Sequence, residues 1–493
     1  MSERKDVFRQ IIKGTSVFGG TQVLTMLVNV IRGKFAALIL GASGMGFSSL
    51  LQSALNPIQQ FFSFGLPISI VRNISQNEGE ERLAMIVAFR RVLLCLSLAG
   101  VATMLASASL ISVATFGNAG YAGWFRTLSV ALFFGILYAG ECSILQGARR
   151  LKKFALVSVA TPLVGLLACV PLYYFYRTDG IAPALAVAAF FSWFVARLLT
   201  ARLYPCLPAQ PWRTTWKIGR NVLSFGGVMM MSALIGALCT YLLNTFIGMG
   251  NMRDVGFFQA VNSITLQCTA MIFAAMGTDY LPYLSSVESS PKDIGLLVNQ
   301  EGETVLLIMT PVIALLILFA PLIVEVLLTP EFNCIIPVLR MMAFSFLGRA
   351  FCFPQDYVCI AKGAKAYFFW VEGVFTNVKT ILLFGTGYYL FGFIGLGYAA
   401  VVNSVLDILC SAVFNWWKFK IHYKKTYYQL FALCFVAAML SLSSTFIGDA
   451  VIEYAVMTSV CVAMCLFSYW QLDKRIDIKE LIHQRRLFNK HNG

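Results

Sequence analysis

The feature that most restricts the fold of this chain is a succession of long apolar stretches that covers nearly all of its length. Each stretch has about 20 residues or more, which is what an α-helix needs to cross the hydrocarbon core of a bilayer. Hydrophobic residues make up 58% and charged residues 12% of the 493 residues, whereas soluble domains average roughly 45–50% and 25%. Because backbone groups in lipid must be hydrogen-bonded inside the protein, the sequence predicts an all-α integral membrane protein.

Fourteen apolar spans can be counted, and each predicts one transmembrane helix. Their approximate bounds are 16–40, 44–71, 90–116, 124–147, 154–176, 181–203, 221–247, 255–283, 296–328, 335–361, 366–390, 393–417, 427–447 and 450–472.

The placement of the basic residues predicts the topology. With the N-terminus in the cytoplasm, the cytoplasmic segments hold 30 of the 38 Lys and Arg residues, and the outward loops hold two, Arg177 and Arg253. This is the asymmetry of the positive-inside rule, so both termini are predicted to be cytoplasmic. The net charge of +15 then follows from topology and from contact with anionic membrane lipids. We therefore expect no nucleic-acid partner.

The cysteines and histidines do not predict a cofactor or metal site. The 13 cysteines contain no CxxC pair, so no disulfide framework or zinc site is indicated. The three histidines, His422, His483 and His491, all fall in the predicted cytoplasmic segments. A histidine-based catalytic centre inside the membrane is therefore not expected.

Four pairs of similar segments recur in the same order along the chain, which indicates an internal repeat. The pairs are FGG from Phe18 and Phe225, GFSSLLQSA from Gly46 with GFFQAVNSI from Gly256, QGARR from Gln146 with KGAKA from Lys362, and GIAPALAVAA from Gly180 with GFIGLGYAAV from Gly392.

The repeat predicts two six-helix lobes. Residues 1–210 would form an N-lobe, 211–420 a C-lobe, 421–473 two extra helices and 474–493 a basic cytoplasmic tail. Because each unit has six spans, the two copies keep the same orientation and are related by a pseudo-twofold axis along the membrane normal. Transporters built from such repeats bind their substrate near the bilayer midplane, between the halves.

The order of these features resembles the polysaccharide flippases of the multidrug/oligosaccharidyl-lipid/polysaccharide exporter superfamily, the O-antigen-type flippases of bacteria. The similarity is densest in GKFAALILGASGMGFSSLLQS from Gly33. The resemblance implies a multi-pass protein of the bacterial inner membrane with a partly cationic cavity. Its cargo would be an oligosaccharide linked to undecaprenyl diphosphate, moved from the cytoplasmic to the outer leaflet by alternating access. Membrane lipids and polysaccharide assembly proteins are the further partners considered.

Polar residues follow one face of the first span. Gln22, Thr25, Asn29 and Arg32 are three or four residues apart, so a helix places them on one side. A mid-span arginine costs roughly 3 kcal/mol to insert, and its fork pairs well with phosphate oxygens. We expect Arg32 and Asn29 to bind the diphosphate, with Lys34 as a helper; the alternative is that Arg32 only reaches toward the lipid headgroups.

The second span carries a similar polar face, and Gln52 and Asn56 lie on it. We expect this face to lie opposite Arg32 and to contribute to cargo binding.

The second half of the chain places its intramembrane charges on three later spans, where two roles are open. Arg349 and Lys379 are candidates for cargo binding, and Asp407, Glu372 and Asp356 for proton or sodium coupling. The alternative for such residues is mutual ion pairing, for example of Lys379 with Asp407, that only holds helices together.

Two other functions compete with the flippase interpretation. A small-molecule or drug antiporter of the same superfamily would need a smaller, more acidic or aromatic cavity than the polar faces of the first two spans indicate. A membrane polysaccharide polymerase or ligase typically carries a large outward loop, whereas the loops here are short, such as FGNAGYAG from Phe116. We therefore expect a transporter and not an enzyme.

Overall fold

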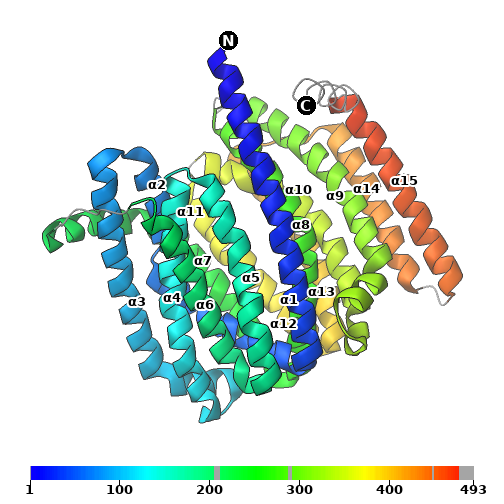
Figure 1. Cartoon of the computed structure of the whole chain (residues 1–493). Coiled ribbons are helices and arrows are strands. Elements are labelled where there is room, and N and C mark those ends of the chain that lie inside the picture. The colour runs from blue at the N-terminus through cyan, green and yellow to red at the C-terminus, as the bar shows by residue number, and fades with distance from the viewer. Residues whose placement is uncertain (1, 205–210, 287–290, 363, 447–448, 477–493) are drawn as a thin grey trace, which may run out of the picture. The chain divides into compact units, whose positions relative to one another are not determined.

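The computed structural model describes residues 2–204, 211–286, 291–362, 364–446 and 449–476. Every regular element within these ranges is a helix (Figure 1), which confirms the predicted all-α class. The longer helices are α1 (Ser2–Ser63), α2 (Leu66–Gln76), α3 (Gly79–Phe116), α4 (Ala122–Gly147), α5 (Leu151–Tyr176), α6 (Ile181–Ala201), α7 (Trp212–Gly250), α8 (Met252–Ser286), α9 (Pro291–Leu327), α10 (Ile336–Ala361), α12 (Thr376–Phe391), α13 (Phe393–Phe419), α14 (Lys425–Ser443) and α15 (Ala450–Ile476). The short ones are η1 (Ala119–Tyr121), η2 (Arg177–Gly180), η3 (Pro330–Ile335), α11 (Lys365–Phe368), η4 (Phe369–Phe375) and η5 (Ser444–Phe446).

Eleven stretches of the described residues are long and apolar enough to cross a membrane. Two of them, Thr21–Ser63 and Leu151–Ala201, each overlap two of the predicted spans. The predicted span 255–283 is helical as part of α8 but is not among the eleven. The predicted number of fourteen is therefore not confirmed.

Helix α1 combines the first two predicted spans and is broken between them at Gly41. The backbone of Gly41 has φ 66° and ψ −172°, which is not helical and which a residue without Cβ adopts at little cost. The break leaves the N–H of Ala42 without its helical acceptor, and this group donates to Oε2 of Glu331 at 3.2 Å. Glu331 also lies 3.8 Å from Nε of Arg253. The Glu331 carboxylate therefore accepts the hydrogen bond of a backbone N–H that the break leaves unpaired at the start of the second half of α1.

Just beyond this break, α1 and α8 touch through their backbones. A Cβ on Gly46 would overlap the carbonyl oxygen of Met252, and a Cβ on Gly256 would overlap that of Ala42. One turn further on, Ser49 Oγ donates to Gln259 Oε1 at 3.2 Å. Gly46 and Gly256 are matching positions of the two sequence repeats, so the contact is reciprocal, as in an isologous interface.

By their internal contacts the helices form two compact units, each with its own core. Unit 1 comprises Met1–Ala260, Leu327–Phe332 and Phe369–Ile381, and unit 2 comprises Val261–Val326, Asn333–Phe368 and Leu382–Gly493. In unit 1, fully buried side chains such as Phe89, Phe125 and Leu132 join α3 and α4. Figure 1 shows α3, α4, α5 and α6 as neighbouring long helices of this unit.

The units do not coincide with the two predicted lobes, because α7 packs against α1 and α3 within unit 1. The lobe boundaries at 210 and 420 stay a prediction.

The two C-terminal helices of the described chain belong to unit 2, where an ion pair joins α15 to α10. Arg340 Nη1 donates to Glu453 Oε1 at 2.7 Å, its Nε donates to the carbonyl oxygen of Ile317 at 3.2 Å, and its Nη2 contacts Met457 Sδ at 3.9 Å. The Arg340 side chain is only 8% exposed. Each of its nitrogens has a partner, as a buried guanidinium requires.

Candidate functional site

An open cavity of about 440 Å³ lies in unit 1, between α1, α4, α5 and α6. The side chains that line it are mostly uncharged and polar, with a few small apolar ones on α5 and α6. The lining residues are Gln22, Thr25, Asn29, Arg32, Tyr138, Ser158, Thr161, Pro162, Gly165, Ala188, Ala189 and Ser192.

Helix α1 contributes the polar face that the sequence predicts. Gln22, Thr25, Asn29 and Arg32 all line this one cavity, because three- and four-residue steps bring side chains to the same side of a helix. The structure thus brings together Arg32 and Asn29, two of the predicted binding residues.

Helix α5 makes room for the Arg32 guanidinium. A Cβ on Gly165 would lie 3.3 Å from Arg32 Nη1, so the absence of a side chain there lets the guanidinium lie against the helix. Two hydrogen bonds tie the walls together: Thr25 Oγ1 donates to the carbonyl oxygen of Ser158 at 3.2 Å, and Thr161 Oγ1 donates to Tyr138 Oη at 3.1 Å. These bonds join α1 to α5 and α5 to α4 along the wall of the cavity.

The charge of the cavity is positive. Arg32 is half-buried and is the single charged residue among the described residues that line the space. No ion pair among the described residues involves it. The surrounding hydroxyls and amides donate and accept hydrogen bonds but add no charge. Such a site suits an anion that also carries hydroxyl groups.

The other binding candidates of the first two spans lie elsewhere. Lys34 is exposed on α1, outside the cavity lining. Gln52 and Asn56 are exposed on the second half of α1, where Gln52 Nε2 lies 3.2 Å from Ser48 Oγ. The walls that face Arg32 in this cavity come from α4, α5 and α6, and not from the Gln52 face.

The candidates from the second half are divided between the units. In unit 2, Arg349 is exposed on α10 and Asp356 is half-buried about two turns further on. Asp407 on α13 is half-buried and accepts a hydrogen bond from Asn403 Nδ2 at 2.7 Å.

Glu372 and Lys379 belong to unit 1 and are half-buried. Glu372 lies in η4, a π-helical segment that packs against α7. The wider turn frees backbone carbonyls, and Asn377 Nδ2 donates to those of Glu372 and Gly373 at 3.1 and 2.9 Å. Single turns of π-helix often occur at functional sites. A pairing of Lys379 with Asp407 stays a prediction.

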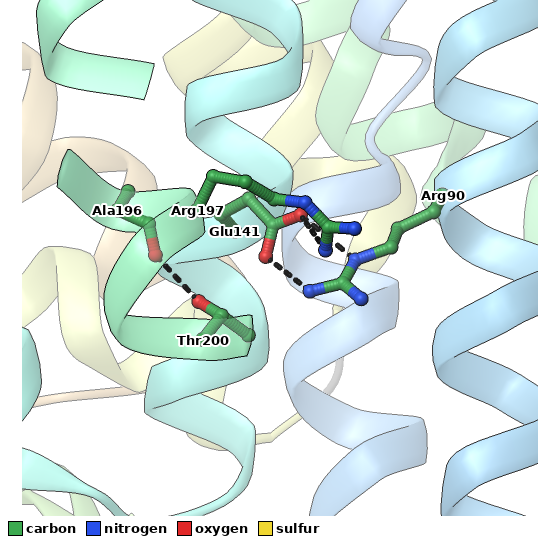
Figure 2. Close-up of polar contacts among 5 residues, drawn as sticks. All are labelled: Arg90, Glu141, Ala196, Arg197 and Thr200. Carbon is green, nitrogen blue, oxygen red and sulfur yellow. Dashed lines mark hydrogen bonds and ion pairs between the residues drawn. The ribbon is translucent and has the colours of Figure 1, made fainter. Parts of the chain in front are cut away.

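The sequence interpretation missed a cluster of charged residues in unit 1 that Figure 2 shows. Arg90 on α3 donates twice to Glu141 on α4, from Nε to Oε1 at 2.8 Å and from Nη2 to Oε2 at 2.7 Å. Arg197 on α6 donates from Nη1 to the same Oε1 at 3.4 Å. The signal available in the sequence was a lone acid near the end of one predicted span, with arginines near the ends of two others.

The described part of the chain holds no group of three or more His, Cys, Asp and Glu residues arranged to bind a metal ion.

Comparison with known proteins places the fold. A family model described as "Polysaccharide biosynthesis protein" matches residues 37–337. A search of curated protein sequences finds no match.

Solved structures similar to this chain include three transporters. A lipid II flippase MurJ in an inward closed conformation aligns with TM-score 0.71 and 12% identity, over 94% of this chain and 99% of that one. An inward-facing multidrug resistance MATE family transporter of the MOP superfamily has TM-score 0.62 and 17% identity, over 79% and 94%. The MATE transporter VcmN of Vibrio cholerae has TM-score 0.61 and 14% identity, over 87% and 100%.

Sequence identities this low show only that the chain shares the fold of these transporters. The family model covers more than half of the chain. The chain belongs to the polysaccharide biosynthesis protein family, with the fold of the multidrug/oligosaccharidyl-lipid/polysaccharide exporter superfamily.

Proposed function

We propose that this protein is a flippase that moves an oligosaccharide linked to a polyprenyl diphosphate from the cytoplasmic to the outer leaflet. The observation that carries the proposal is the cavity of unit 1, whose described lining residues include a single charged side chain, Arg32. The family and the fold supply its context: the family is one of polysaccharide biosynthesis, and a structurally similar protein is a lipid II flippase.

The charge of the cavity favours an anionic cargo. An unpaired diphosphate in a low-dielectric interior would cost on the order of tens of kcal/mol by Born arguments. A guanidinium offsets this cost with two parallel hydrogen bonds to phosphate oxygens. A drug antiporter for cations would instead need a carboxylate on the wall, and none lies among the described lining residues.

The neutral part of the lining suits the sugar portion of such a cargo. Thr25, Asn29, Ser158, Thr161 and Ser192 present hydroxyl and amide groups to the cavity. These groups donate and accept, as sugar hydroxyls do. Lys34, Arg349 and Lys379 are proposed as further cationic contacts at other stages of transport, with Gln52 and Asn56 as polar contacts along the route.

The topology of the proposal is that of a bacterial inner-membrane protein with fourteen spans and both termini in the cytoplasm. The charge asymmetry of the sequence supports it. The reciprocal contact of Gly46 with Met252 and of Gly256 with Ala42 supports a pseudo-twofold axis between two repeats. Reporter fusions after Lys153 should report the cytoplasm and fusions after Asn118 the exterior; the opposite pattern would reverse the topology.

Transport is proposed to proceed by alternating access, with Asp407, Glu372 and Asp356 as candidates for coupling to a proton or sodium gradient. Asp407 is the first choice, because it is half-buried on a predicted span and hydrogen-bonded to Asn403. Polysaccharide assembly proteins are the proposed partners beyond cargo and membrane lipid.

The test is complementation of a deletion strain of the native host. Wild type, Arg32→Ala, Arg32→Lys and the control Arg126→Ala, which removes an exposed arginine from α4, are compared for surface glycan and for lipid-linked glycan left on the cytoplasmic face. We expect the Arg32→Ala strain to accumulate the intermediate, Arg32→Lys to export partly, and the control to export normally, at equal protein levels. Normal export by Arg32→Ala would refute the role of this cavity, and a deletion strain without any accumulated intermediate would refute the function.

A further inference from the structure

We infer that the cluster of Arg90, Glu141 and Arg197 in unit 1 is a second anion site, which binds the phosphate of a lipid at the end of the helices that the proposed topology places in the cytoplasm. The two arginines share one carboxylate, so the cluster carries one excess positive charge. Glu141 is 5% exposed, Arg90 15% and Arg197 37%. The excess charge is shared between a mostly buried arginine and a partly exposed one, and in apolar surroundings it is costly unless another ion compensates it.

The cluster also has more hydrogen-bond donors than acceptors. Nη1 of Arg90 is buried and has no partner among the described residues, although buried polar groups are nearly always paired. Arg197 reaches Glu141 only at 3.4 Å, a long distance for a charge-assisted bond. The hydroxyl of Thr200, on the same stretch of α6, donates to the carbonyl oxygen of Ala196 at 2.7 Å (Figure 2) and is not hydrogen-bonded to the cluster. An anion would supply the missing acceptors.

The buried ion pair of unit 2 shows what a purely structural arginine looks like in this protein. Arg340 faces one carboxylate, of Glu453, and each of its nitrogens has a partner. That pair is neutral and complete, whereas the cluster of unit 1 is neither. The difference argues that the second arginine of the cluster is present for a ligand.

The position of the cluster relates it to the cavity. Glu141 follows Tyr138 by three residues on α4, about 4.5 Å of rise, and Arg197 follows Ser192 by five on α6, about 7.5 Å. Both Tyr138 and Ser192 line the cavity. The cluster therefore lies about one turn beyond the cavity wall, toward the ends of α4 and α6. The exposed fraction of Arg197 leaves it accessible to a headgroup there.

Two kinds of lipid carry the required phosphate, the diphosphate-linked cargo and an ordinary anionic phospholipid. Binding of a lipid phosphate does not depend on the proposed function; only the identification of that lipid as the cargo rests on it. Binding to the purified full-length protein in detergent, measured by native mass spectrometry, separates the sources. The probes are polyprenyl diphosphate against polyprenol, and phosphatidylglycerol against diacylglycerol, so that each pair differs in phosphate.

The variants are chosen to leave the helix contacts in place. Arg197→Gln keeps the Arg90–Glu141 pair and should weaken binding of the phosphate-bearing probes roughly tenfold, as expected for the loss of a charged hydrogen bond. Glu141→Gln raises the charge excess and should strengthen that binding, whereas a structural role predicts no gain. Arg202→Gln, an exposed arginine at the end of α6, is the control. Each measurement is repeated with Arg32→Ala, so that the cavity arginine does not mask the change.

A loss confined to polyprenyl diphosphate identifies the cargo as the ligand, and a loss for both phosphate probes identifies lipid phosphate in general. Unchanged binding in a folded Arg197→Gln, together with no gain in Glu141→Gln, would overturn the inference. Should Arg197→Gln fail to fold, the Glu141→Gln result and Arg197→Lys, which keeps the charge, decide it. A protein whose deletion strain accumulates no lipid-linked intermediate, but which passes this binding test, would lose the proposed function and keep the anion site.

Discussion

Replacing Gly165 with leucine is expected to weaken cargo binding in the cavity although no polar side chain is substituted. Gly165 lies on α5, and a Cβ there would sit 3.3 Å from Arg32 Nη1. Alanine therefore requires the guanidinium to shift by only a few tenths of an ångström, and Gly165→Ala should bind cargo within about threefold of wild type. A leucine side chain continues into the space that the guanidinium occupies, so Arg32 must turn away from its phosphate position.

The size of the leucine effect follows from the interaction that is lost. Hydrogen bonds to charged groups contribute about 1.5–3 kcal/mol, which corresponds to roughly 10- to 150-fold in affinity. The assay is binding of polyprenyl diphosphate to the purified protein. Gly123→Leu on α4 is the matched control, because a Cβ at Gly123 meets no atom within 4 Å.

Two results would contradict this reasoning. Wild-type affinity in Gly165→Leu, combined with a loss in Arg32→Ala, would mean that Arg32 binds phosphate in another orientation. An equal loss in Gly123→Leu would mean that bulk added to unit 1 is harmful wherever it is placed, and that the position of Gly165 has no special role.

Three further predictions concern packing and coupling. Gly256→Ala should lower the melting temperature measured in detergent, because its Cβ would overlap the carbonyl oxygen of Ala42 and overpacking costs about 1–3 kcal/mol; an unchanged value would deny the close approach of α1 and α8. Glu453→Ala should lower the melting temperature more than Gly256→Ala does, since an unpaired buried Arg340 costs about 3–5 kcal/mol. The double variant Arg340→Met with Glu453→Leu should recover most of that loss. Asp407→Asn should abolish gradient-driven transport in vesicles while cargo binding persists, and full transport would exclude Asp407 from coupling.

The hydrophobic pattern was sufficient to predict the helical class, because about 20 apolar residues in succession have few other solutions. The three- and four-residue spacing also predicted that Gln22, Thr25, Asn29 and Arg32 share a face, and all four line one cavity. What the spacing could not show is which helices close that cavity. Contacts such as that between Gly165 and the Arg32 guanidinium depend on three-dimensional packing.

The second half of the chain shows why helical spacing fails at an irregular turn. Glu372 and Lys379 are seven residues apart, a spacing that places two side chains on one face only in a regular α-helix. In the structure η4 (Phe369–Phe375) is π-helical, with more residues per turn, so the angular positions on either side of it are offset. The residue that stabilises the irregular turn, Asn377, carries no pattern that distinguishes it in the sequence.

The cluster of Arg90, Glu141 and Arg197 was missed for a different reason. Its members lie on three helices, and each alone resembles an ordinary charge at the end of a span. Only their convergence shows that one carboxylate serves two guanidiniums.

The break at Gly41 gives α1 the properties of a lever. The half that carries Arg32 and the half that contacts Gly256 are separate helical rods joined at one residue. Arg32 precedes Gly41 by nine residues, about 13 Å at 1.5 Å per residue, so a swing of about 10° about that joint carries the arginine by roughly 2 Å. That displacement is enough to make or break a guanidinium–phosphate contact, while the backbone contact of the second half with α8 stays intact. Under the proposed function, such a swing would let the arginine follow the phosphate of the cargo while the contact between Gly46 and Gly256 stays unchanged.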